Sequence, residues 1–171
     1  ASSLGVSLQF ETDVRDPDAY AREYDLVVGS DGVNSVTRAR HEQHFNPRIA
    51  TGRCRFIWLG TRKKLDAFTF AFAQTSYGWF NLHAYRFDEE WSTFIVETPE
   101  ETWAKHNIGA MEPAESIAFC EKLFADLLDG NPLVSNARHL RGAAVWLKFQ
   151  RVLCERWYKD NVVLLGDAAH T

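Results

Sequence analysis

The chain contains Asn161-Val-Val-Leu-Leu-Gly166-Asp167-Ala-Ala-His-Thr171, the stretch that decides its fold class. The apolar run is typical of a buried parallel strand, and it breaks at a Gly-Asp pair where a helix would begin. Ligands of α/β sheets bind beyond the carboxyl ends of such strands. Gly166 allows a ligand to approach the backbone closely, and Asp167 offers a carboxylate to a hydroxyl group. The alternative is that Asp167 is only a helix N-cap.

A second segment repeats this design: Tyr24-Asp25-Leu-Val-Val-Gly29-Ser30-Asp31-Gly32-Val-Asn34-Ser35-Val-Thr-Arg38. An apolar strand ends at Gly29, an acidic turn follows, and a helix is expected through about His41. Two such turns in one chain favour a shared nucleotide-type ligand over two unrelated caps.

Between these segments the pattern changes to long alternating strands, which indicate an antiparallel sheet with one covered face. Four strands are expected, at residues 53–59, 67–74, 77–87 and 91–98. Further expectations are a strand at 4–11, a polar connection at 13–23, a helix capped by Thr98, a helix from about 112 to 128, and a strand at 142–154.

One face of the expected strand 67–74 is a row of rings, Phe68, Phe70 and Phe72. On the next strand one face carries Trp79, Asn81, His83, Tyr85 and Phe87. An apolar wall with a few hydrogen-bonding groups suits an aromatic ligand, and His83 and Tyr85 are the candidate substrate contacts. The alternative is packing alone, because aromatic residues also fill ordinary strands.

The paired acidic turns resemble those of the flavoprotein aromatic hydroxylases, the single-component FAD monooxygenases of the p-hydroxybenzoate hydroxylase type. In that family an Asp-Gly motif followed by Ser and Arg lies close to the FAD and nicotinamide pyrophosphates, and it is matched here by Asp31, Gly32, Ser35 and Arg38. A later Gly-Asp motif holds the ribityl chain of FAD, and it is matched by Gly166 and Asp167. The middle of the chain is similar to the enzymes that act on salicylyl-CoA and 2-aminobenzoyl-CoA.

The resemblance implies an enzyme with FAD as cofactor and NADH or NADPH as co-substrate. Such an enzyme uses O2, through a flavin hydroperoxide, to hydroxylate an aromatic substrate. The class of substrates includes aryl-CoA thioesters. The protein positions the ring and excludes water, while the flavin carries out the oxygen chemistry. His83 is the expected polar contact of the substrate, because histidine donates or accepts a proton near neutral pH.

Two other hypotheses stay open at this point. One keeps FAD and changes the reaction, as in halogenases, ubiquinone-pathway hydroxylases and isoprenoid reductases, which use related turns. The other is a β-rich binding module without redox chemistry, in which Asp31 and Asp167 are only caps. Distance separates these hypotheses, because flavin-binding turns should converge on one cleft and independent caps have no reason to meet.

The expected fold class is α/β with an α+β middle. An incomplete Rossmann-like FAD-binding part would comprise residues 1–43 and 158–171, and an antiparallel substrate-binding sheet covered by helices would comprise 44–157. No Gly-x-Gly-x-x-Gly fingerprint occurs, although the family has one at its N-terminus. We therefore expect an internal fragment of a longer enzyme, inactive alone.

Composition supports a globular protein. The chain has 171 residues, 46% of them hydrophobic, which is enough for a sizeable core. A net charge of -4 without a long basic stripe argues against nucleic-acid binding, and no apolar run is long enough to span a bilayer. Cys54, Cys120 and Cys154 lack C-x-x-C spacing and indicate reduced thiols of a cytoplasmic protein.

A pair of histidines and two groups of basic residues are interpreted as ordinary surface features. His41 and His44 are three residues apart, but without a third ligand nearby no metal site is expected. Basic residues gather around an expected hairpin and in a later region, where they could meet phosphates but are usually solvated edges. These residues are Arg53, Arg55, Arg62, Lys63 and Lys64, and then Arg138, Arg141, Lys148 and Arg151. The oligomeric state and the choice between NADH and NADPH are not encoded in any motif of this chain.

Overall fold

The computed structural model describes residues 1–135 and 146–171, and the chain divides into two compact units. Unit 1 comprises Ala1–Ala50 and Gln150–Thr171, and unit 2 comprises Thr51–Phe149. The boundaries between the two units lie inside the domain expected at 44–157, because residues 44–50 and 150–157 belong to unit 1. The two ends of unit 2 are adjacent, since the Gly52 N–H donates to the Phe149 carbonyl at 2.7 Å.

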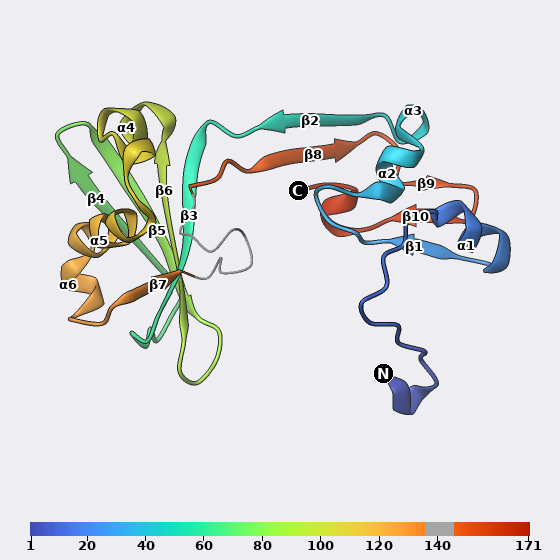
Figure 1. Cartoon of the computed structure of the whole chain (residues 1–171), viewed down its shortest axis with the longest axis horizontal. Coiled ribbons are helices and arrows are strands. Elements are labelled where there is room, and N and C mark those ends of the chain that lie inside the picture. Colours follow the sequence, from blue (N-terminus) through green and yellow to red (C-terminus); the bar gives the residue numbers. More distant parts are fainter. Residues whose placement is uncertain (136–145) are drawn as a thin grey trace. The chain divides into compact units, whose positions relative to one another are not determined.

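Unit 1 is built from short elements. Three strands form one small sheet in the order β1-β10-β9, in which β1 runs parallel to β10, and β2 pairs with β8 in a separate ribbon (Figure 1). Its elements in chain order are η1 (Ser2–Leu4), α1 (Pro17–Glu23), β1 (Val27–Gly29), α2 (Val36–Arg40), α3 (Glu42–Phe45), β2 (Pro47–Thr51), β8 (Gln150–Cys154), β9 (Tyr158–Lys159), β10 (Val162–Leu164) and η3 (Gly166–Ala168).

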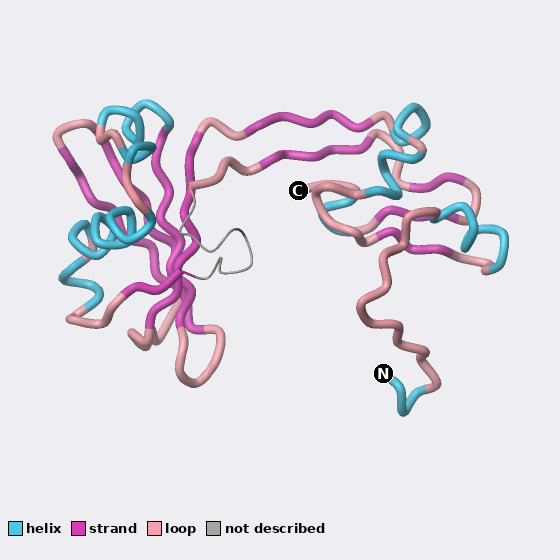
Figure 2. The backbone as a smooth tube through the Cα atoms, viewed as in Figure 1, coloured by secondary structure: helices cyan, strands magenta, loops and turns pink. Residues whose placement is uncertain are grey.

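Unit 2 is a five-stranded antiparallel sheet in the order β4-β5-β6-β3-β7 (Figure 2). The four expected strands are present, each within three residues of its expected bounds. The elements are β3 (Cys54–Thr61), β4 (Thr69–Thr75), β5 (Gly78–Arg86), β6 (Ser92–Pro99), α4 (Glu100–Lys105), η2 (Ile108–Ala110), α5 (Pro113–Leu123), α6 (Ala125–Leu128) and β7 (Leu133–Ser135).

The two faces of the unit 2 sheet differ in what covers them. Phe80, Leu82 and Val96 are fully buried in a core that includes residues of α5 and α6, and the helices lie on this side of the sheet (Figure 1). On the other face Phe70 and Phe72 remain 60% and 65% exposed. Among the described residues of unit 2, no helix or strand covers this row of rings, which leaves large apolar side chains exposed on one face.

Some expectations about local structure were wrong. Residues 4–11 form no strand, because their alternating apolar side chains have no neighbouring strand to pair with in the described chain. The connection 13–23 contains helix α1, whose start is set by Asp16 as cap and Pro17 as first residue. The Thr98 hydroxyl donates to the Trp79 carbonyl instead of capping a helix, and Pro99 takes the cap position.

Three further elements differ from expectation. The helix expected at 112–128 is interrupted at Phe124 into α5 and α6, and β7 was not foreseen because it has only three residues. Of the strand expected at 142–154, residues 142–145 lie outside the described residues. Only Gln150–Cys154 form strand β8.

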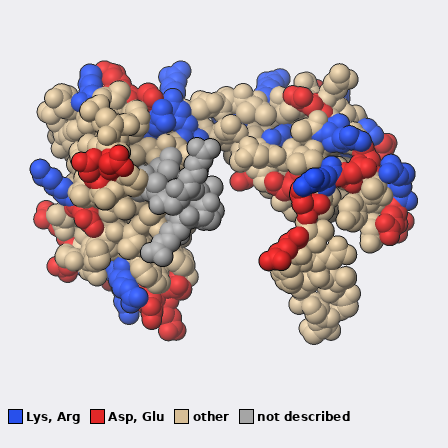
Figure 3. Space-filling model, in the orientation of Figure 1, with Lys and Arg blue, Asp and Glu red and all other residues tan. Residues whose placement is uncertain are grey.

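The described surface shows charges of both signs, and the described helices are short. On the face that Figure 3 shows, acidic and basic side chains of the described residues are interspersed. Among those residues, every helix is too short or too polar to cross a membrane.

The asymmetry of the sheet gives a test of the fold. Phe80→Ala should lower the free energy of unfolding by about 3–5 kcal/mol, because it opens a cavity in the helix-covered core. The matched change Phe72→Ala on the open face should cost less than about 1 kcal/mol. Urea denaturation followed by circular dichroism measures both values, and equal losses would contradict the assignment of the two faces.

Candidate functional site

The two acidic turns follow directly from two neighbouring parallel strands of unit 1. Gly29 at the end of β1 is in register with Leu164 at the end of β10, and the Leu165 N–H donates to the Gly29 carbonyl at 3.0 Å. Asp31 and Asp167 therefore leave the sheet at the same edge. The two turns are thus neighbours in the fold, and their convergence on one cleft stays a prediction.

Arg38 joins the two turns. Its guanidinium donates to the carbonyl oxygens of Asp167, at 3.4 Å, and Ala168, at 3.0 Å, and also to the Val33 carbonyl. The side chain is buried, with 6% of its surface exposed. Because its donors are directed to backbone oxygens, Arg38 fixes the relative position of the turns and does not present its charge to the surface.

The Asp31 carboxylate holds the first turn together. It accepts hydrogen bonds from the Ser35 hydroxyl at 2.6 Å, the Thr37 N–H at 2.9 Å and the Thr37 hydroxyl at 3.1 Å. Burial by itself would raise the pKa of Asp31, but these hydrogen bonds outweigh it and hold the pKa below its ordinary value. Asp31 thus has the role of a local brace for the start of α2.

Asp167 is different, because its carboxylate remains available. The residue is exposed, and its carboxylate accepts no hydrogen bond from the described part of the chain. The neighbouring Gly166 has φ +60°, and Gly32 in the first turn has φ +79°, a region that favours glycine. A Cβ built at either position meets no atom within 4 Å, so the backbone of both turns faces open space.

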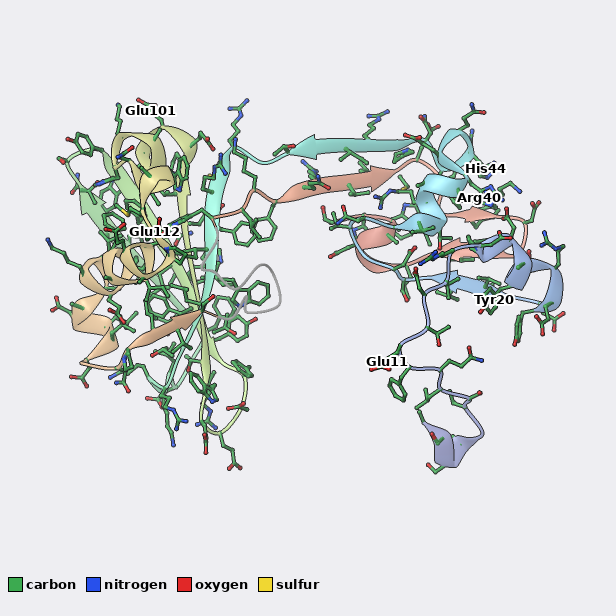
Figure 4. The ribbon with its side chains drawn as sticks, in the orientation of Figure 1. Glu11, Tyr20, Arg40, His44, Glu101 and Glu112 are labelled. Carbon is green, nitrogen blue, oxygen red and sulfur yellow. The ribbon has the colours of Figure 1, made fainter. Side chains whose placement is uncertain are left out.

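A groove of about 730 Å³ begins at the first turn. It is lined by β1 with Ser30 and Asp31, by Tyr20 and Tyr24, and by residues between Ser7 and Val14. Tyr20 projects from α1 in unit 1 (Figure 4). The groove has the size of a small-molecule site and is bounded by one of the two converging turns.

The open face of the unit 2 sheet brings His83 and Tyr85 onto the row of rings. Phe70 is in register with His83, and their rings are 5.1 Å apart, edge to face. Tyr85 stacks on Phe68 with a centroid distance of 5.1 Å. Both candidate substrate contacts therefore lie on the aromatic wall that the alternation predicted.

A hollow of about 580 Å³ lies on the same face, beside His83. Its lining residues are Cys54, Phe72, Trp79, Asn81, Glu97, Thr98 and Pro99. The Asn81 amide lies 2.8 Å from His83 Nε2, and Glu97 Oε2 lies 3.8 Å from the same nitrogen. Glu97 was not among the residues predicted for the site. The available signal was a single charged residue that follows the apolar run Phe94-Ile95-Val96 and precedes Thr98.

The basic residues that could have met phosphates are mostly paired. Arg55 and Lys148 both contact Glu100, at 2.8 Å, and lower the pKa of that carboxyl to about 2. Arg62 pairs with Glu90 and Lys63 with Asp129. Arg138 and Arg141 lie outside the described residues. These four pairs are typical of solvated strand edges.

The histidines of unit 1 are engaged locally. His41 Nε2 lies 2.6 Å from an Asp18 carboxylate oxygen, and His44 Nε2 lies 3.0 Å from the Tyr158 carbonyl. Arg40 and His44 extend from α2 and α3 (Figure 4). Among residues 1–135 and 146–171, no group of three or more His, Cys, Asp or Glu is arranged to hold a metal ion.

Sequence comparison supports the resemblance over the whole chain. The chain is 37% identical to salicyloyl-CoA 5-hydroxylase of a Streptomyces species, an alignment that covers 100% of this chain and 33% of the relative. It is 34% identical to protodeoxyviolaceinate monooxygenase of Chromobacterium violaceum, over 97% of this chain and 43% of the relative. The chain thus spans well under half the length of these curated relatives. A scan against protein-family models matches none.

Solved structures show the same fold. The chain resembles a tetrameric form of 2-methyl-3-hydroxypyridine-5-carboxylic acid oxygenase with a TM-score of 0.55 and 19% identity, over 85% of this chain and 38% of the other. It resembles the flavin-dependent brominase Bmp2 with a TM-score of 0.55 and 13% identity, over 86% of this chain and 36% of the other.

The fold is therefore that of a segment of the flavin-dependent monooxygenases. Within that class, the resemblance to the flavoprotein aromatic hydroxylases is confirmed, since the curated relatives are named as a hydroxylase and monooxygenases.

The hydrogen bonds that the Asp31 carboxylate accepts predict that the folded protein loses stability at low pH. Asp31→Ala should lower the free energy of unfolding by about 1 kcal/mol at neutral pH, as for loss of a helix cap. Because its pKa is lowered in the folded state, this stabilisation is present above the ordinary carboxyl pKa of about 4 and is lost as pH falls through the folded value. Urea denaturation between about pH 3 and 7 measures the difference.

The control is Asp13→Ala, since Asp13 is largely exposed and pairs only with Arg15 among the described residues. An Asp31→Ala loss no larger than that of the control would contradict the bracing role.

Proposed function

We propose that this chain is the part of an FAD-dependent aromatic-ring monooxygenase that holds one side of the flavin and supplies the aromatic wall for the substrate. The position of Asp31 and Asp167 beyond the carboxyl ends of two neighbouring parallel strands supports this proposal. Independent helix caps would not require the two turns to be joined by one buried arginine.

The turns fit a flavin in distinct ways. Asp167, with Gly166, would accept hydrogen bonds from the ribityl hydroxyls, because its carboxylate is exposed and without a partner in the described chain. Gly32 leaves the first turn open to the pyrophosphate. Asp31 and Arg38 act through the turns, since Asp31 braces the start of α2 and Arg38 joins the backbones.

When bound, FAD reduced by NADH or NADPH supplies the activation of O2 that ring hydroxylation needs. The residues of unit 2 would bind and orient the substrate. The row of rings would pack against the substrate ring and keep water away from it, and His83 would be a polar contact of the substrate. Tyr85 would contact the substrate through its hydroxyl, which makes no hydrogen bond with the described residues.

The substrate that we propose is an aromatic acyl compound, including aryl-CoA thioesters, because a 37% identical relative is named salicyloyl-CoA 5-hydroxylase. All three cysteines are free, which supports an enzyme of a reducing compartment such as the cytoplasm.

The flavin role of Asp167 can be measured in the full-length protein. Asp167→Ala should weaken FAD retention at least about tenfold, as for the loss of a hydrogen bond to a charged group. Asp160→Ala is the matched control, because that carboxylate is also exposed in unit 1 but bonds to Lys159. Flavin absorbance after dialysis, compared with the wild type, gives the result, and unchanged FAD content in Asp167→Ala would remove this residue from the site.

The substrate class calls for a turnover experiment. Full-length protein should bind FAD, and aromatic CoA thioesters should stimulate its NAD(P)H oxidation more than the free acids, with hydroxylated product matching the NAD(P)H consumed. A colourless protein, or NAD(P)H consumption without hydroxylated product for either set of compounds, would overturn the proposed function.

A further inference from the structure

The hollow on the open face of unit 2 contains a carboxylate without a strong partner. Glu97 lines it together with Phe72, Trp79 and Pro99. Its side chain is 29% exposed, and no Lys or Arg of the described chain forms an ion pair with it. A carboxylate on an apolar wall is costly unless a donor or a cation reaches it.

The neighbouring groups do not meet this need. His83 Nε2 lies 3.8 Å from Glu97 Oε2, beyond hydrogen-bond distance, and the same nitrogen is engaged by the Asn81 amide at 2.8 Å. The Cys54 thiol is the other group beside Glu97, and burial first and this carboxylate second raise the pKa of the thiol. A thiol is only a weak donor.

Asn81 adds a second acceptor. Its Oδ1 is buried and has no hydrogen-bond partner within the described residues. Asn81 is directly opposite Glu97 on the neighbouring strand, and Phe72 is opposite Asn81 on the other side. The wall therefore places two acceptors at one point, and one of them, Asn81 Oδ1, is an unsatisfied buried polar atom that requires an explanation.

We propose that this hollow binds the hydrogen-bond-donating substituent, an amino or hydroxyl group, of the aromatic substrate, with Glu97 and Asn81 as the specificity-determining residues. The rings of Phe72 and Trp79 contact the substrate ring, and Glu97 accepts the N–H or O–H at its edge. When the Asn81 amide turns about its broad two-fold χ2 torsion, it gives up its contact with His83 Nε2 and offers Oδ1 to the substrate as the second acceptor. The inference rests on the proposed function for the identity of the ring as substrate.

The test measures binding without turnover in the full-length protein. Hydroxy-, amino- and methoxybenzamides, substituted at matching ring positions, are titrated in the absence of NAD(P)H while tryptophan fluorescence is followed, because Trp79 lines the hollow. Neutral amides avoid charge repulsion by Glu97. At one ring position the hydroxy or amino compound should bind about tenfold or more tightly than its methoxy analogue, which has the ring but no donor.

Two variants test whether Glu97 and Asn81 cause the preference for a hydrogen-bond donor. Glu97→Gln and Asn81→Leu should each reduce the preference for the donor at least severalfold, with a smaller effect on the methoxy compound. Gln74→Met is the matched control, because Gln74 is an exposed amide on the same face and does not line the hollow. It should leave the preference unchanged, and circular dichroism shows whether each variant is folded.

Two results would overturn the inference. One is equal binding of donor and methoxy compounds at every ring position. The other is a donor preference that survives both Glu97→Gln and Asn81→Leu, which would place the recognition elsewhere. A comparison of the amino with the hydroxy compound then identifies which donor the hollow takes. These results do not depend on flavin content or hydroxylation, so they are distinguishable from a failure of the proposed function.

Discussion

The arrangement of unit 1 depends on the pairing of two short parallel strands, β1 and β10, and on the buried arginine that ties the turns beyond them. The strands contribute three residues each, too few to fix the loops by their own ladder. Arg38 donates to backbone carbonyls on both turns, and its guanidinium is buried between them. The relative position of the two turns thus depends on this one buried side chain together with the strand pairing.

The two carboxylates of these turns have separate physical roles. Asp31 is held by three hydrogen bonds from its own loop, whereas Asp167 accepts none from the described residues. The local bracing of a helix start, expected as one alternative for both residues, is therefore observed for Asp31 and not for Asp167. The first turn is held by hydrogen bonds of its own residues, and the second turn leaves its carboxylate exposed.

Much of the fold could be predicted because it follows from short-range patterns in the sequence. Alternation located the four long strands of unit 2 and the face on which His83 and Tyr85 lie, since side chains alternate strictly across a sheet. Helix α1 was missed because its start signal, Asp16 followed by Pro17, sits in a stretch that is otherwise polar. The bracing by Arg38 and the isolation of Glu97 could not be predicted, because both depend on contacts between segments far apart in sequence.

Unit 2 is inserted between two strands that are themselves paired, so the chain leaves and re-enters unit 1 through adjacent residues, Gly52 and Phe149. A segment with neighbouring ends can change in length and sequence without pulling its host apart. An insertion or deletion within the ring-bearing sheet of unit 2 would accordingly leave the pairing of β1 with β10 in unit 1 intact.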